Sequence, residues 1–172
     1  ENVAAGDVLV AIASNGCHSN GYSLIRKILN DTNADLSQVI DGEKLLDHLL
    51  TPTRIYVKQI LNLMRHISIK SLAHITGGGL IENLPRVIPR DLSVIINTDT
   101  WNLPPIFAWL SEQGKINSDE MFKTFNCGIG LVLCVERNNA DKTINYLNDN
   151  GETAWVIGSI IKNNGGSKIQ IK

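Results

Sequence analysis

The segment Asp7–Ala13 (DVLVAIA) is a short, almost uninterrupted apolar run that ends abruptly at Ser14. Such a run is typical of a β-strand that is covered on both faces. After Asn20 the apolar residues recur with helical spacing as far as Leu29, which makes Asn20 the expected N-cap of a helix. The polar residues between the two patterns therefore lie at a strand-to-helix junction. A chain that begins in this way is constrained to a layered fold in which helices cover a buried sheet.

The same alternation of strands and helices continues to the end of the chain. We expect the further strands at Leu72–Thr76, Asp91–Thr98, Cys127–Val135 and Thr153–Ile161, and the further helices at Gly42–Leu50, Leu80–Leu84, Pro104–Gly114, from Ser118, and at Ala140–Asn148. Asn163-Asn164-Gly165-Gly166 predicts a hairpin turn that returns into Ile169–Ile171. The prediction is a single α/β (α+β) domain with a mixed, largely antiparallel sheet of four to six strands packed by helices.

One more helix is expected after Thr51-Pro52, because threonine is a good cap and proline is favoured in the first turn. Its buried stripe is expected to consist of the apolar residues Ile55, Ile60, Leu61 and Met64. The basic residues Arg54, Lys58 and Arg65 are then left nearer to solvent.

Composition excludes several classes of protein. Of the 172 residues, 43% are hydrophobic and 19% are charged, and 16 basic against 17 acidic residues leave a net charge of −1. The chain is therefore expected to fold, and it has no global field for nucleic acid or anionic membranes. Its apolar stretches are too short to span a bilayer. Its three cysteines lack CxxC spacing, which argues against a disulfide framework or a zinc site and favours the reducing cytoplasm.

The first candidate site is the ten-residue junction Ser14–Ser23 (SNGCHSNGYS), which is rich in serine, asparagine and glycine. Free backbone N–H groups and the positive end of a helix dipole meet at such a junction, so a phosphate would fit there. The alternative is that these residues only cap the helix and close a turn.

The second candidate site is His74-Ile75-Thr76 followed by Gly77-Gly78-Gly79. Successive glycines are expected where φ is positive or where another group approaches the backbone closely. The segment is neither a P-loop nor a GxGxxG fingerprint. His74 could carry a proton near neutral pH, or it could be a structural hydrogen-bonding group.

The third segment, Asn126-Cys127-Gly128-Ile129-Gly130, leads into the strongest predicted strand. Its glycines mark a bulge or a place where another group presses on the backbone. Cys127 has no base near it in the sequence, so we interpret it as a core residue. Paired carboxylates are absent from the pattern, and the sequence predicts no bound metal.

Taken together, the segments resemble the C-terminal half of the phosphoribosylformylglycinamidine cyclo-ligases, also called aminoimidazole ribonucleotide synthetases. The resemblance runs in order through the chain, over Gly6–Leu29, Leu49–Leu61, Ala73–Pro89, Trp101–Leu110, Phe125–Leu133 and Ala154–Ile160. It implies that residues 1–172 are the C-terminal domain of an enzyme whose N-terminal domain is not in this chain. A start at Glu1 without methionine fits a domain boundary.

The resemblance also implies an activity in purine biosynthesis. The parent enzyme uses ATP to convert formylglycinamidine ribonucleotide to aminoimidazole ribonucleotide, in the cytoplasm and as a homodimer. ATP and Mg²⁺ are bound mainly by the N-terminal domain, so no cofactor or metal is expected in this chain alone. The expected partners are the ribonucleotide substrate and the N-terminal domain, with no nucleic acid and no membrane.

This domain is then expected to wall the cleft, to bind the substrate phosphate and to be inactive alone. The residues expected to contact the ligand are Ser19, Asn20, Gly21 and Ser23 of the first loop, Thr76, Gly77, Gly78 and Gly79 of the second, and His18 and Arg54 for charge, with His74 as the catalytic proton carrier. Arg54 could instead pair with a carboxylate. The competing interpretation is a non-catalytic module that binds a phosphorylated metabolite, which would need only one anion loop.

Overall fold

The computed structural model describes residues 3–172. The strands are β1 (Val8–Ala13), β2 (Val39–Ile40), β3 (Glu43–Lys44), β4 (Ser71–His74), β5 (Leu92–Ile96), β6 (Ile129–Val135), β7 (Ala154–Lys162) and β8 (Ile169–Ile171). The helices are α1 (Tyr22–Thr32), α2 (Leu45–Leu50), α3 (Val57–Leu63), α4 (Gly79–Arg86), α5 (Pro105–Gly114), α6 (Ser118–Thr124) and α7 (Ala140–Asp149), with short 3₁₀ turns at Thr98–Thr100 and Arg137–Asn139.

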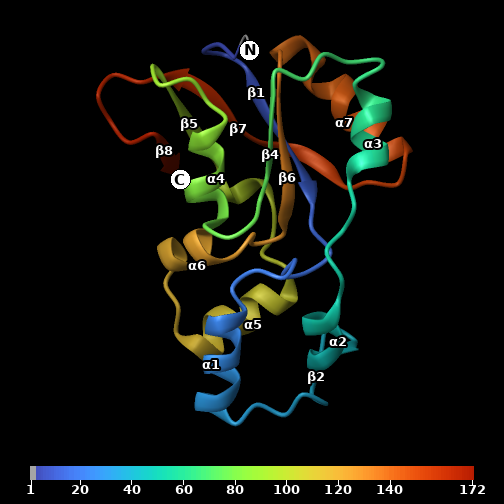
Figure 1. The fold of residues 1–172 in the computed structure, drawn as a ribbon, viewed down its shortest axis with the longest axis vertical. Coiled ribbons are helices and arrows are strands. Elements are labelled where there is room, and N and C mark those ends of the chain that lie inside the picture. The colour runs from blue at the N-terminus through green and yellow to red at the C-terminus, as the bar shows by residue number, and fades with distance from the viewer. Residues whose placement is uncertain (1–2) are drawn as a thin grey trace.

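Six strands form one curled sheet in the order β4-β6-β1-β7-β5-β8 (Figure 1). Every pairing in it is antiparallel except that of β5 with β8. The predicted mixed, largely antiparallel sheet of four to six strands in an α/β domain is therefore confirmed.

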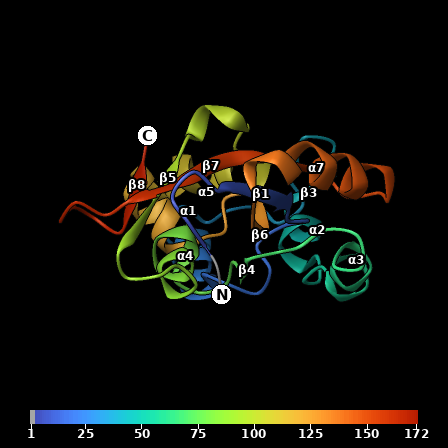
Figure 2. The same cartoon turned by 90° about the horizontal axis from the view of Figure 1, so that it is seen from above.

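The two faces of the sheet carry separate cores because side chains alternate along each strand. In β1, Leu9 and Ala11 pack on one face with α4, whereas Val8, Val10 and Ile12 pack on the other with α3 and α7. Viewed from above, α3 and α7 lie toward one side and α4 toward the other (Figure 2). Burial on both faces explains why β1 reads as a continuous apolar run.

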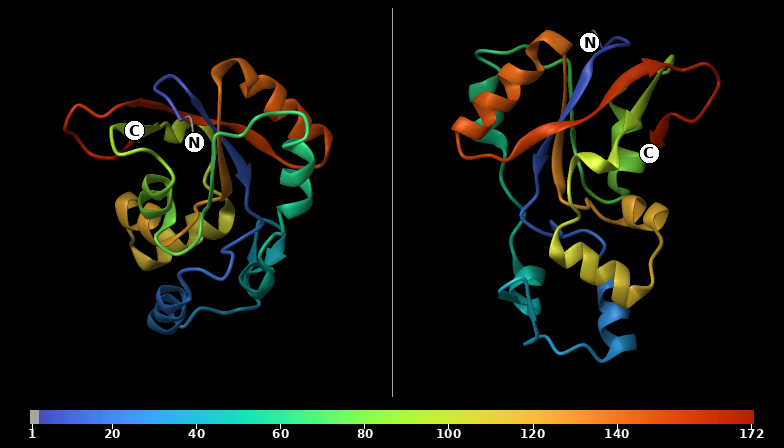
Figure 3. Two further views of the ribbon diagram at one scale, coloured as in Figure 1. Left: turned by 45° about the horizontal axis from the view of Figure 1, so that its top comes forward. Right: turned by 180° about the vertical axis from the view of Figure 1, so that it is seen from behind.

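A third core lies beyond one end of the sheet and is built from helices. Phe107 of α5, Ile25 and Ile28 of α1 and Leu45 of α2 are all buried there. Figure 3 shows these helices extending past the end of the sheet at which β1 finishes. The polar junction after β1 therefore lies between the sheet and the helical core.

The hairpin predicted at residues 163–166 is wrong. β8 pairs in parallel with β5 and not with β7, so the connection steps over the end of β5. The N–H of Asn163 donates to the Asp91 carbonyl at 2.9 Å, and the hydroxyl of Ser93 donates to the Ser167 carbonyl at 3.1 Å. Hydrogen bonds to β5 outweigh the turn preference of the Asn-Gly pair.

The buried stripe predicted around α3 is also wrong. Residues 51–56 are not helical, so Thr51-Pro52 does not begin a helix; Thr51 is instead the C-cap of α2, and α3 begins at Val57. Of the predicted stripe only Ile60 is buried, whereas Ile55, Leu61 and Met64 are 78%, 57% and 55% exposed. Two apolar stripes run along this segment. The stripe that packs against the sheet consists of Tyr56, Ile60, Leu63 and Ile67.

Three smaller predictions about helix ends need correction. The N-cap of α1 is Gly21, with φ at +74°, and not Asn20. The helix predicted at Gly42–Leu50 begins only at Leu45, because Asp41 and Gly42 turn with positive φ between β2 and β3. α4 is longer than the single turn predicted for it and includes Pro85.

Gly158 of β7 lies against the backbone of β5 with no room for a side chain. A Cβ on Gly158 of β7 would lie 1.9 Å from the Ile95 carbonyl oxygen of β5. We predict that Gly158→Ala lowers the free energy of unfolding by about 2–4 kcal/mol, because backbone on both strands has to move. Urea denaturation measures this. The matched control is Gly166→Ala, which meets nothing within 4 Å, and equal losses in the two variants would contradict the prediction.

Candidate functional site

The junction after β1 is a tight, left-handed turn that a buried asparagine holds in place. His18 and Ser19 have φ values of +53° and +60°. The Asn126 side chain, fully buried, accepts from the Ser14 hydroxyl at 2.9 Å and donates to the Gly16 carbonyl at 2.8 Å. Its oxygen also accepts from the N–H of Gly128 at 2.8 Å. Asn126 thereby fastens the junction to the residues that lead into β6.

The side chain of His18 is buried inside this turn, with 3% of the residue exposed. Its Nε2 lies 3.2 Å from the Asn15 N–H, 3.4 Å from the Arg54 N–H and 2.5 Å from the Asn15 side-chain oxygen. Burial, with smaller contributions from His74 and Arg54, lowers the pKa of His18 from 6.5 to about 4. His18 is therefore neutral at pH 7 and links the junction to residues 51–56, so it adds no charge to the site.

Tyr56 and His74 pack with His18 as a cluster of three rings. The ring centroids are 6.0 Å apart for Tyr56 and His74, and 6.5 Å apart for His18 and His74. The Tyr56 hydroxyl donates to the Ala13 carbonyl at 2.8 Å, and burial raises the pKa of this phenol. A Cβ on Gly130 would lie 1.8 Å from the Tyr56 oxygen. The close approach predicted near this glycine is therefore made by Tyr56.

Asn83 shapes the glycine loop in the way that Asn126 shapes the first junction. Its buried amide donates to the carbonyls of Gly77 and Gly79 at 3.2 and 2.8 Å, and its oxygen accepts from the Thr76 hydroxyl at 3.2 Å. In the described chain, the N–H groups of Gly77 and Gly78 donate to no residue. The loop therefore points its carbonyls at Asn83 and leaves N–H donors for a ligand.

The three glycines are needed for different reasons. Gly78 and Gly79 have positive φ values, +92° and +55°. Gly79 also has no room for a side chain, because a Cβ there would lie 2.0 Å from the Phe122 carbonyl oxygen. Gly77 has no positive φ, and the atom nearest to its Cβ position is the Asn20 side-chain oxygen at 3.8 Å. The structure thus brings the two predicted loops together at Gly77, where neither strain nor packing within the described chain requires a glycine.

The remaining residues of the first loop divide between packing and exposure. A Cβ on Gly21 would lie 2.3 Å from the Phe125 ring, so this glycine serves packing. Ser19 and Ser23 are exposed, and the Ser19 hydroxyl lies 3.4 Å from that of Thr53. No side chain caps α1, so its first N–H groups stay available to an anion.

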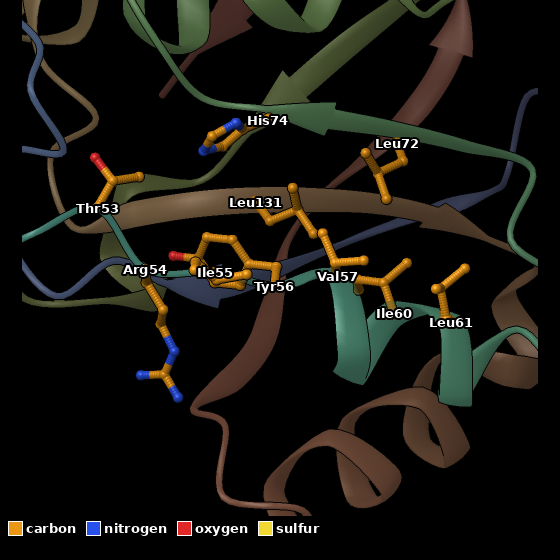
Figure 4. A pocket seen from close by; sticks show the side chains of 10 residues that line it. All are labelled: Thr53, Arg54, Ile55, Tyr56, Val57, Ile60, Leu61, Leu72, His74 and Leu131. Carbon is orange, nitrogen blue, oxygen red and sulfur yellow. The ribbon is translucent and has the colours of Figure 1, made fainter.

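Arg54 forms an ion pair with a carboxylate, Glu152, that the sequence pattern did not identify as its partner. Its guanidinium lies 3.0 Å from the carboxylate of Glu152, whose side chain is fully buried. It also donates to the Gly151 carbonyl at 3.3 Å. Figure 4 shows the Arg54 side chain pointing away from His74. The alternative interpretation of Arg54, pairing with a carboxylate, describes its position, although that carboxylate is buried and not at the surface.

An apolar groove of about 520 Å³ opens beside the ring cluster (Figure 4). It is lined by Thr53, Arg54, Ile55, Tyr56, Val57, Ile60, Leu61, Leu72, His74 and Leu131. His74, the last residue of β4, and Thr53, whose hydroxyl lies 3.4 Å from that of Ser19, place part of the groove beside the two loops. The groove follows the exposed apolar stripe of α3 and the edge strand β4, so it joins a hydrophobic surface to a polar site.

Other features of the described residues add little chemistry. Burial raises the pKa of the Cys127 thiol to about 12, and Cys127 donates to the Met121 carbonyl at 3.4 Å, as expected of a core residue. Within residues 3–172 no three His, Cys, Asp or Glu side chains are grouped so as to hold a metal. No helix in that part of the chain is long and apolar enough to cross a membrane.

The fold and the site define an α/β domain with two uncapped helix starts and two loops at one end of a curled sheet. The chain belongs to the family of AIR synthase related proteins, C-terminal domain, whose model matches residues 4–170.

Solved structures share this fold at low sequence identity. The hydrogenase maturation protein HypE of E. coli matches with a TM-score of 0.65 and 20% identity, over 99% of this chain and 47% of HypE. Thiamine-monophosphate kinase from Stenotrophomonas maltophilia matches with a TM-score of 0.67 and 14% identity, over 100% of this chain and 52% of the kinase. PurL of T. maritima, in complex with FGAR, matches with a TM-score of 0.61 and 10% identity, over 100% of this chain and 26% of PurL. The chain thus spans about half the length of HypE and of the kinase.

The buried, neutral His18 predicts a pH dependence of stability. Because folding lowers the pKa of His18, its stabilising contribution to the free energy of unfolding is complete above pH 6.5 and is lost as the pH falls toward 4. We expect the free energy of unfolding to fall by up to about 3 kcal/mol over this range. His18→Gln should flatten the profile measured by urea denaturation, whereas His66→Gln, at an exposed position, should not. An unchanged slope in His18→Gln would contradict this assignment.

Proposed function

We propose that this chain is the C-terminal half of a phosphoribosylformylglycinamidine cyclo-ligase, which closes the imidazole ring of aminoimidazole ribonucleotide at the expense of ATP. The observation that carries the proposal is that the two loops meet at Gly77. The N–H groups of Gly77 and Gly78 have no acceptor in the described chain, and neither backbone strain nor packing there requires a glycine at position 77. Family membership supports an ATP-using relative, and the order of motifs along the chain favours the cyclo-ligase.

The loops suit a phosphate or a transferred phosphoryl group. Backbone N–H groups of Gly77 and Gly78, the uncapped start of α1 and the hydroxyls of Ser19 and Ser23 supply donors without a net positive charge. Such fixed donors stabilise charge that develops on a phosphoryl group as it is transferred. The Asn20 side chain, which lies between the loops, can orient the ligand.

His74 is proposed to carry the proton. In the reaction, the formamide oxygen is first activated as a phosphate ester, and the tethered amine of the substrate then attacks the same carbon. A C–N bond forms, the C–O bond to phosphate breaks, and the amine loses a proton. His74 is exposed at the end of β4, next to the glycine loop, where its imidazole can accept this proton.

The apolar groove is proposed to receive the N-terminal domain. Exposed Ile55, Val57 and Leu61 give the chain a hydrophobic surface beside the site, as an enzyme half would have. The covered share of HypE and of the kinase, about half of each, is consistent with a missing domain of similar size. That domain would hold ATP and Mg²⁺ and form the homodimer. The three buried free cysteines suit the cytoplasm.

The function is tested by assaying ATP-dependent formation of aminoimidazole ribonucleotide. We predict turnover by the full-length protein and none by residues 1–172 alone, because the chain lacks the domain proposed to bind ATP. His74→Asn in the full-length protein should lower kcat by about 10²–10⁴-fold with little change in melting temperature. Turnover by the chain alone would overturn the division of roles. A full-length protein that binds the ribonucleotide without turnover would instead favour the phosphometabolite-binding module.

Gly77 gives a sharper test of the phosphate site. An added Cβ has room, so we predict that Gly77→Ala keeps the stability of the parent within about 1 kcal/mol but weakens binding of a ribonucleotide monophosphate at least tenfold. Calorimetric titration and urea denaturation measure the two effects. Gly166→Ala, in open space, is the control for binding. Unchanged affinity in Gly77→Ala would remove the phosphate from this loop.

A further inference from the structure

A second cavity, of about 400 Å³, lies where the connection from β5 to α5 passes the first residues of β7. It is lined by Ala13, Ser14, Thr100, Trp101, Asn102, Pro104, Gly128, Thr153, Ala154 and Trp155. None of these residues lines the apolar groove, and the function proposed above does not use the cavity.

Two indole rings form its aromatic wall. The centroids of Trp101 and Trp155 are 6.5 Å apart, and the rings are inclined at 39°. The indole N–H of Trp101 donates to the Cys127 carbonyl at 3.0 Å, which fixes that ring. Gly128 has φ at +96°, and its Cβ position lies 2.6 Å from Pro104 and 4.0 Å from the Trp101 ring, so the backbone beside Trp101 is tightly packed as well. The cavity is therefore formed before any ligand arrives.

The polar groups of the cavity are neutral. None of its ten lining residues carries a charge. The hydroxyls of Ser14 and Thr100 already donate to Asn126 and to the Asn97 carbonyl. The side chains of Asn102 and Thr153, by contrast, bond to no described residue. They offer a ligand both donors and acceptors.

We propose that this cavity binds the base of a nucleoside, a flat and uncharged heteroaromatic ring. Indole faces stack on such a ring without regard to its substituents. The free Asn102 amide, with a donor and an acceptor side by side, matches the edge of a purine such as adenine.

Two other ligand classes fit the cavity less well. A phosphate would meet no cation in it, and a hydrocarbon would leave the Asn102 amide and the Thr153 hydroxyl unpaired.

The chain has three tryptophans, Trp101, Trp109 and Trp155, and two of them, Trp101 and Trp155, line the cavity. Tryptophan fluorescence therefore reports binding there. Residues 1–172 are titrated with adenosine, ribose and inorganic phosphate while tryptophan fluorescence is recorded. We expect saturable quenching by adenosine, none by ribose, and no displacement of adenosine by phosphate. Absence of saturable quenching by adenosine, equal quenching by ribose, or displacement by phosphate would each overturn the proposal.

Three variants locate the site. Trp155→Leu should weaken adenosine binding at least tenfold through lost stacking. Asn102→Ala, at an exposed position where folding is not at risk, should weaken it about fivefold through a lost hydrogen bond. Trp109→Phe, on α5 in the helical core, should leave the affinity unchanged. Wild-type affinity in Asn102→Ala, or loss of binding in Trp109→Phe, places the base elsewhere. Because the assay uses no ribonucleotide phosphate and no turnover, its failure is distinct from failure of the cyclo-ligase proposal.

Discussion

The buried amide of Asn126 is the constraint on which the site depends. One side chain binds the hydroxyl of Ser14, the carbonyl of Gly16 and the N–H of Gly128, so it ties the end of β1 to the beginning of β6. A buried amide with unpaired groups would cost several kcal/mol, and full pairing therefore selects one geometry for both segments. The turn that carries His18 and Ser19 is held by this pairing rather than by regular secondary structure.

Asn83 applies the same principle to the second loop. Both asparagines donate to backbone carbonyls of their loops, and in the glycine loop the N–H groups of Gly77 and Gly78 have no acceptor within the described chain. A loop held through its carbonyls is preorganised for anions without any basic residue. The phosphate site that we propose therefore needs no net positive charge, in keeping with the net charge of −1.

How far the sequence predicted this structure depends on whether a feature is local. β1 and β6 were predictable because strands buried on both faces read as continuous apolar runs. The buried stripe of α3 was not, since that segment carries two apolar stripes and only the sheet decides between them. The position of β8 depends on hydrogen bonds to β5, about 75 residues earlier in the chain.

The candidate site divides in the same way. Its loops were predictable from glycine, serine and asparagine in sequence, and Gly77 and Asn20 do come together. Asn83 and Glu152 were missed, because their partners are identified only by the fold. Within Leu80–Leu84 the sequence has two adjacent polar residues, Glu82 and Asn83, and nothing in the pattern distinguishes them. His18 was expected to supply a charge, but its burial lowers its pKa and keeps it neutral. The spacing of residues in the sequence does not show that burial.

The order of the strands gives the sheet two unequal borders. On one side the last strand is β8, which covers β5, and on the other it is β4, beside which the hydrophobic stripe of α3 runs. Unpaired backbone groups on a border strand are a template for further strands. Both borders carry such groups, but β4 also lies beside the apolar groove, so a strand or domain that pairs with β4 would bury hydrophobic surface as well.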